Sequence, residues 1–90
     1  MLNDESRSWI GKAQTLEDHL TGTRQFAYLA LLKVMKCPEL SAGLRDVQTG
    51  SMMRAPAGAY PAHVVDQIRD LDAHVTTELK KEISSRCPAR

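Results

Sequence analysis

The run FAYLALLKVM, residues 26–35, constrains the fold more than any other part of this 90-residue sequence, because nine of its ten residues are apolar. A helix on a protein surface has one apolar stripe, whereas this run is apolar on every side apart from Lys33. A membrane-spanning helix needs about 20 apolar residues, so a run of this length belongs in a protein core or a subunit interface. The sequence therefore predicts a helix that is buried around most of its circumference.

The spacing of apolar residues predicts an all-α fold, a small bundle of three to four helices in a single domain over residues 1–90. Thr23 is a suitable N-cap for the apolar run, Pro38 ends that helix and begins the next, and Pro61 can open the last one. Residues 51–61 contain two prolines and a glycine without periodicity, which predicts a loop. The predicted helices cover about 5–21, 24–36, 38–49 and 62–86.

The long C-terminal helix carries a narrow apolar stripe at three- and four-residue spacing: Val64, Ile68, Leu71, Val75, Leu79 and Ile83. We expect this helix to pack along the first two helices, while the short third helix closes one end. A chain of this size buries little more than about 60% of its surface on folding, and it has few large apolar residues. We therefore expect a symmetric homodimer that uses the apolar run, this stripe, or both. The expected interface residues are Phe26, Leu29, Leu32, Val64, Ile68, Leu71 and Val75.

Charge is balanced overall but uneven along the chain. The net charge is +1, far from the excess expected of a dedicated nucleic-acid binder. Residues 61–79 sum to −3 and residues 80–90 to +3. Such alternation suits complementary helix packing or end-to-end subunit pairing.

The two cysteines, Cys37 and Cys87, are each followed by proline. The N-terminus lacks the basic start and apolar core of a signal peptide, and no membrane span follows, so we expect a cytoplasmic protein with both cysteines as thiols. A disulfide between them becomes possible only if a leader has been removed. The Cys-Pro pairs resemble the short motif in which some haem-responsive proteins ligate iron through a thiolate, which leaves a thiol, haem or metal sensor as an alternative.

His63, Asp66, Asp70 and His74 share one polar face of the last helix. The two histidines lie three turns apart, roughly 16 Å, so they cannot share one metal ion without another helix. We expect a solvated face and no metal or other cofactor.

No phosphate-binding loop, nucleophile elbow or metalloprotease motif is present, so the sequence favours a non-enzymatic protein-binding module: a regulator, adaptor, inhibitor or immunity-type protein that occludes a partner. The residue types favoured in adaptable interfaces predict the binding residues Trp9, Met52, Met53, Arg54 and Tyr60. The alternative is a compact dimeric DNA-binding regulator in which the second and third helices form a helix-turn-helix. Its basic patch would be Lys33, Lys36, Arg45 and Arg54.

Overall fold

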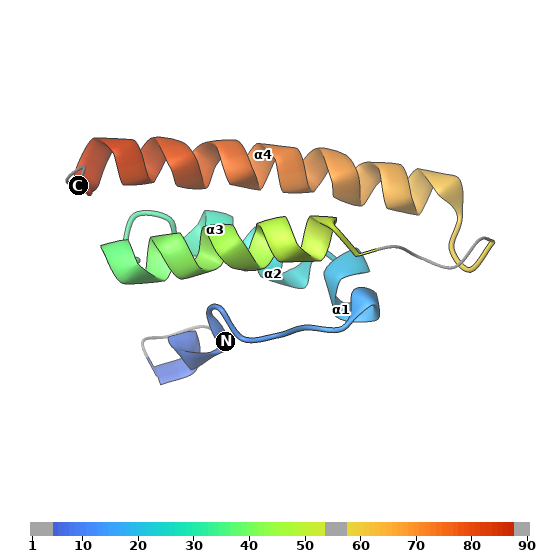
Figure 1. Cartoon of the computed structure of the whole chain (residues 1–90), viewed down its shortest axis with the longest axis horizontal. Helices are drawn as coiled ribbons and strands as arrows, with labels where there is room; N and C mark the ends of the chain where they lie inside the picture. Colours follow the sequence, from blue (N-terminus) through green and yellow to red (C-terminus); the bar gives the residue numbers. More distant parts are fainter. Residues whose placement is uncertain (1–4, 54–57, 88–90) are drawn as a thin grey trace.

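The computed structural model describes residues 5–53 and 58–87, and within these ranges it contains helices and connecting segments only. The all-α prediction is confirmed. In chain order the elements are the 3₁₀ helix η1 (Glu5–Trp9) and the α-helices α1 (Leu16–Leu20), α2 (Thr23–Leu31), α3 (Cys37–Ser51) and α4 (Ala62–Arg86). Figure 1 shows α4 running the length of the molecule, with the remaining helices on one side of it.

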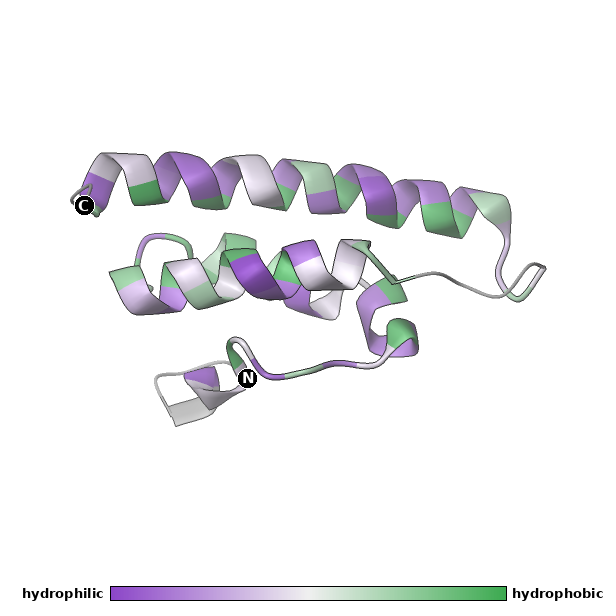
Figure 2. Ribbon diagram, viewed as in Figure 1, coloured by the Kyte–Doolittle hydropathy of each residue, from purple (hydrophilic) through white to green (hydrophobic). Residues whose placement is uncertain are grey.

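Helices α3 and α4 form an antiparallel hairpin (Figure 1). Figure 2 shows that the apolar residues of α4 lie on the edge that faces this neighbour. The expectation that the last helix packs mainly along the first two is therefore wrong, since α3 lies along it. The reason is that α3 is long and buries Leu40 and Val47, two turns apart, on one side. The fully buried apolar residues of the core are Tyr28, Met35, Leu40, Val47, Val75 and Leu79.

The first predicted helix, 5–21, is broken in the structure. Residues 5–9 form η1, and Gly11 has φ +82°, a left-handed conformation that ends the helical path. The chain resumes a helix at Leu16, where the Thr15 hydroxyl accepts a hydrogen bond from the Asp18 N–H. The apolar spacing carried no sign of this break, because it comes from contacts between residues 10–15 and other helices.

Helix α2 ends at Leu31, although the apolar run predicted a helix to residue 36. The next residues form turns, with the Met35 N–H bonded to the Leu31 carbonyl. Arg86 of α4 donates to the carbonyls of Leu32 and Met35 at 2.9 and 3.1 Å. The arginine thus satisfies carbonyls that would otherwise have continued the helix ladder.

Two helices follow the sequence pattern closely. Helix α4 spans Ala62–Arg86, the same residues as predicted, with Pro61 at its N-cap. Helix α3 is slightly longer than the predicted 38–49. Gly43 lies inside α3, where a Cβ would stand 3.0 Å from Cε1 of Tyr28. This glycine allows the Tyr28 ring to pack against the α3 backbone.

Cys37 and Cys87 form a disulfide, with their Cα atoms 5.8 Å apart. The expectation of two thiols is therefore wrong for this structure. Cys37 begins α3 and Cys87 directly follows α4, so antiparallel packing brings them to the same end of the hairpin. The chain itself connects α3 to α4 at the other end, so the hairpin is covalently closed at both.

Three buried carboxylates on the hairpin hold the N-terminal part of the chain. Asp46 of α3 and Asp72 and Glu82 of α4 are each less than 10% exposed. Each accepts hydrogen bonds from side chains in residues 14–33. Buried carboxylates need such partners because ionised groups lose much free energy when water is removed. No helix in the described residues is long and apolar enough to cross a membrane.

Candidate functional site

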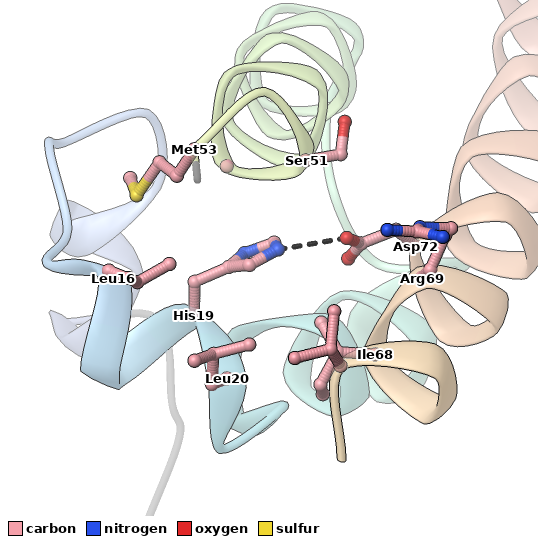
Figure 3. A pocket seen from close by; sticks show the side chains of 10 residues that line it. Leu16, His19, Leu20, Ser51, Met53, Ile68, Arg69 and Asp72 are labelled. Atoms are coloured by element: carbon pink, nitrogen blue, oxygen red, sulfur yellow. Dashed lines mark hydrogen bonds and ion pairs between the residues drawn. The ribbon is translucent and has the colours of Figure 1, made fainter. Parts of the chain in front are cut away.

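A half-open pocket of about 300 Å³ lies where α1, the end of α3 and the first half of α4 meet. Its walls combine the aliphatic Leu16 and Leu20 of α1 and Val65 and Ile68 of α4 with polar side chains. Figure 3 shows the His19 ring reaching from α1 across the pocket to Asp72 of α4. His19 Nε2 and Asp72 Oδ2 are 2.8 Å apart, and both side chains are buried.

Gln25 of α2 completes this cluster. Its amide nitrogen lies 2.9 Å from Asp72 Oδ1, 3.1 Å from the His19 carbonyl oxygen and 3.2 Å from His19 Nδ1. Two of these neighbours are oxygens that only accept, so the amide must present its nitrogen to them. His19 Nδ1 therefore faces the Gln25 amide nitrogen, while Nε2 faces Asp72 Oδ2.

This arrangement leaves neither ring nitrogen of His19 open to a molecule in the pocket. A histidine acting as a general base needs one nitrogen within hydrogen-bond reach of the proton that it removes. Ser51 also lines the pocket, but its hydroxyl donates to the Gln48 carbonyl at 2.9 Å and not to the ring. The geometry favours a structural role, in which the His19–Asp72 pair joins α1 to α4.

The His19 ring packs directly on the α3 backbone. A Cβ on Gly50 would stand 2.4 Å from His19 Nδ1, closer than real Cβ contacts come. This cluster was not predicted from the sequence, although one signal for it was present. Asp72 lies four residues after Ile68 and three before Val75, so it falls on the buried side of α4 beside the apolar stripe. A carboxylate at such a position predicts a buried partner.

Asp46 is the centre of a second buried cluster near the N-terminal segment. It accepts a hydrogen bond from the Tyr28 hydroxyl and from Gln14 Nε2 at 3.0 Å, and it pairs with Arg24 Nη1 at 2.8 Å. Burial, together with the bond to Asp46 and the charge of Asp46, raises the pKa of the Tyr28 phenol far above its ordinary value. Arg24 also stands over the Trp9 ring, 5.5 Å from its centroid.

Trp9 belongs to this cluster, since its ring centroid lies 5.1 Å from that of Tyr28. The ring is half-buried, and its N–H is buried without a hydrogen-bond acceptor. The structure thus places Trp9 as a packing residue that fastens η1 to α2. Its predicted part in partner binding stays a prediction.

Glu82 is the centre of the third cluster. Lys33 Nζ and Arg86 Nε lie 2.9 and 2.6 Å from its two oxygens. The hydrogen bond from Lys33, followed by that from Arg86, holds the pKa of Glu82 below its usual range. The single polar residue of the apolar run therefore has an acidic partner, while its own side chain remains 80% exposed.

The basic patch for DNA stays a prediction. Lys33 is paired with Glu82, Lys36 is exposed at the start of α3, and Arg45 is exposed along that helix. Arg54 lies outside the described residues. The outward face of α3 carries Arg45 with the uncharged Ser41 and Gln48, so one cation faces solvent where a recognition helix would need several.

The other predicted partner-binding residues differ in exposure. Met52 is 76% exposed just after α3, whereas Met53 is half-buried and lines the pocket. Tyr60 is half-buried before α4. Their part in partner binding stays a prediction.

A different apolar surface remains uncovered, and we call it the α2 stripe: Phe26, Ala30 and Val34. Phe26 is 61% and Val34 58% exposed, and Ala30 between them is also exposed. Their four-residue spacing puts them on one side of α2 and the turn after it. The apolar run is therefore buried on one side only, contrary to the expectation that it is enclosed.

The residues predicted for a dimer interface divide into three groups. Phe26 is exposed in the α2 stripe. Ile68 and Val75 are buried within the chain's own core and are not free to contact a second chain. The remaining members are half-buried and pack partly within the chain: Leu29, Leu32, Val64 and Leu71.

The polar face of α4 is open to solvent. His63, Asp66, Asp70 and His74 are all exposed, in agreement with the expectation of a solvated face. Within residues 5–53 and 58–87, no three histidine, cysteine, aspartate or glutamate side chains are grouped so that they could hold a metal ion.

Comparison with known proteins gives no relative from which a role could be transferred. No protein-family model matches the chain, and neither a curated protein nor a solved structure matches it.

Proposed function

We propose that this chain is a small non-enzymatic binding module that covers part of another protein's surface with the α2 stripe. The observation that carries the proposal is the exposure of Phe26 and Val34, at 61% and 58%, within a run whose other side forms the core. Large apolar residues that stay exposed together on one face are typical of protein interaction sites.

The rigidity of the hairpin supports this role. The disulfide closes one end, and three buried carboxylate clusters fix the N-terminal segment and α2 against the hairpin. A stripe presented on such a support loses little conformational freedom when it binds, which favours affinity. Both ring nitrogens of His19 lie within hydrogen-bond distance of side chains of the same chain, which supports a structural role for the pocket and leaves the α2 stripe as the proposed binding surface.

The disulfide also bears on the cellular compartment in which we propose that the protein acts. Disulfides persist in oxidising compartments and are rare in the cytosol. We therefore favour an oxidising compartment over the cytoplasmic location expected from the sequence. Alkylation of free thiols at the moment of cell lysis tests this: a chain without alkylated cysteines supports it, and a chain alkylated on Cys37 and Cys87 contradicts it.

The binding proposal is tested by capture of proteins from a lysate of the source organism, with nuclease added to remove nucleic-acid bridges. Phe26→Ser should abolish the captured protein. Met52→Ser is the matched control, because Met52 is even more exposed but lies outside the α2 stripe. Capture that is unchanged by Phe26→Ser, or lost equally with Met52→Ser, would contradict the proposal.

A further inference from the structure

We propose that the Cys37–Cys87 disulfide is a redox latch: its reduction by a dithiol releases Arg86 from the turn after α2 and so loosens the Val34 end of the α2 stripe. The inference rests on the proposed function, since it names a regulation of the same surface. Three observations carry it: the contacts of Arg86, the place of the disulfide beside those contacts, and the helix end at which each cysteine lies.

Arg86 holds the turn after α2 through its side chain. Its Nη2 donates to the carbonyls of Leu32 and Met35 at 2.9 and 3.1 Å. Its Nε donates to Glu82 at 2.6 Å, which fixes the direction of the guanidinium. The two carbonyls lie on either side of Val34, whose own side chain is exposed. The position of Val34 therefore depends on the backbone that Arg86 holds.

The disulfide closes the same contact covalently. Cys37 lies two residues after Met35, and Cys87 directly follows Arg86, the last residue of α4. Groups on either side of a crosslink meet at a high effective concentration, so their hydrogen bonds form readily. Without the crosslink, Arg86 belongs to a terminal helical turn, and such turns open more easily than the middle of a helix. Reduction should therefore weaken the hold of Arg86 on the turn.

The two sulfurs differ as leaving groups. Cys37 is the first residue of α3, and Cys87 is the C-cap of α4. The N-terminal end of a helix favours negative charge and the C-terminal end disfavours it, so a thiolate is better stabilised on Cys37. Both cysteines are half-buried rather than enclosed in the core. A stabilised thiolate leaves faster in thiol–disulfide exchange, which makes Cys87 the sulfur that is attacked.

Reduction then proceeds in two exchanges. A thiolate of the dithiol attacks Cys87 Sγ, the S–S bond breaks, and its electron pair leaves on Cys37 Sγ, which takes up a proton from water. The second thiol of the reductant, once deprotonated, attacks the mixed disulfide and frees Cys87, which is protonated in turn. The dithiol becomes a cyclic disulfide. Overall, two electrons and two protons pass from the dithiol to the two cysteines.

The oxidised chain is the form that binds through the α2 stripe. In the reduced chain, Val34 and its backbone have to be ordered when a partner binds. Ordering one side chain at an interface weakens binding by about twofold to tenfold. Phe26 lies at the other end of the stripe, within α2, so its contribution is retained.

The first test uses the reciprocity of coupling: if the disulfide supports the contacts of Arg86, these contacts support the disulfide to the same extent. The full chain is equilibrated with mixtures of reduced and oxidised dithiothreitol, and its thiols are counted by alkylation and mass spectrometry. Arg86→Ala should shift the equilibrium toward the dithiol by about tenfold or more, because hydrogen bonds from a charged donor are lost. Glu82 keeps Lys33 as a partner in this variant.

Lys80→Ala is the matched control, because it removes an exposed positive charge from the same helix. It should leave the redox equilibrium unchanged. An equal equilibrium constant in Arg86→Ala and the wild type would overturn the inference, as would an equal shift in both variants.

The second test observes the turn in the folded chain. The carbonyl ¹³C resonances of Leu32 and Met35 report the hydrogen bonds that these groups accept. Both should shift when the wild type is reduced, and they should shift alike in oxidised Arg86→Ala. The Gln48 carbonyl, which accepts from the Ser51 hydroxyl, should keep its resonance. Unchanged resonances at the turn would refute the latch, and so would complete unfolding on reduction, because a latch requires a folded reduced chain.

The outcomes separate this inference from the proposed function. Phe26-dependent capture that is equally strong with the oxidised and the reduced chain overturns the latch and retains the binding module. A shifted redox equilibrium and shifted carbonyl resonances, without any Phe26-dependent capture, retain the latch and remove the role of the α2 stripe toward other proteins.

Discussion

Reduction of the Cys37–Cys87 disulfide is expected to lower the free energy of unfolding by about 4 kcal/mol. The bridge joins residues 50 apart in the sequence. The chain-entropy treatment gives about 3 kcal/mol for a 15-residue loop and about 4.7 kcal/mol for a 100-residue loop. A domain of this length has a total stability of about 5–13 kcal/mol, so the loss removes a third of it or more.

The measurement is urea unfolding at neutral pH with and without a phosphine reductant, followed by far-UV circular dichroism. Two quantities should change. The midpoint should fall, and the slope of the free energy against urea should rise, because the released loop exposes more surface in the unfolded chain. The double variant Cys37→Ser, Cys87→Ser should match the reduced chain and be insensitive to reductant.

The reasoning would be refuted by a loss below about 1 kcal/mol, or by an unchanged slope at a lower midpoint. The second result would place the effect in the folded state, in the packing around the cysteines, and not in the entropy of the unfolded chain. The Cys87 side chain packs against the core, so the slope is what distinguishes these two origins.

Two further predictions concern the buried contacts. The pKa of Tyr28 is raised above the value of about 10 that it has in the unfolded chain, so its contribution to stability is fully present below about pH 10 and is lost as the pH rises beyond it. The fall in the free energy of unfolding above pH 10 should therefore be smaller in Tyr28→Phe. An equal fall in both proteins would contradict this. Gly50→Ala should cost about 1–3 kcal/mol in thermal or urea unfolding, because its Cβ would overlap the His19 ring. Gln48→Ala, on the exposed side of the same helix, should change stability by no more than about 0.5 kcal/mol, and similar values for both variants would show that the ring does not pack on Gly50.

Local signals predicted α4 well. Proline at its start, a Cys-Pro pair at its end and a sustained three- and four-residue apolar spacing act within a few residues of each boundary. The end of α2 and the break in the first helix were not predictable in this way. Beyond Leu31, the backbone carbonyls accept hydrogen bonds from Arg86, and the Lys12 carbonyl accepts one from Arg24. Both contacts join residues that are distant in sequence.

Among the predicted interface residues, too, apolar spacing did not decide which are exposed and which are buried. Phe26 was predicted as an interface residue from the apolar run, and it lies exposed on α2. Ile68 and Val75 came from the same reasoning and are buried within one chain, because apolar spacing marks a buried face without saying what buries it.

The sequence by itself determined the helical class, the position of the long C-terminal helix and the presence of more apolar surface than α2 can bury on one side. These features depend on residue type and short-range spacing. Only the tertiary structure decided that Cys37 meets Cys87, that Asp72 holds His19, and that Phe26 faces outward while Tyr28, two residues later, lies in the core. Each of these depends on how helices far apart in the chain are placed against one another, and that placement is set by the packing of the whole chain.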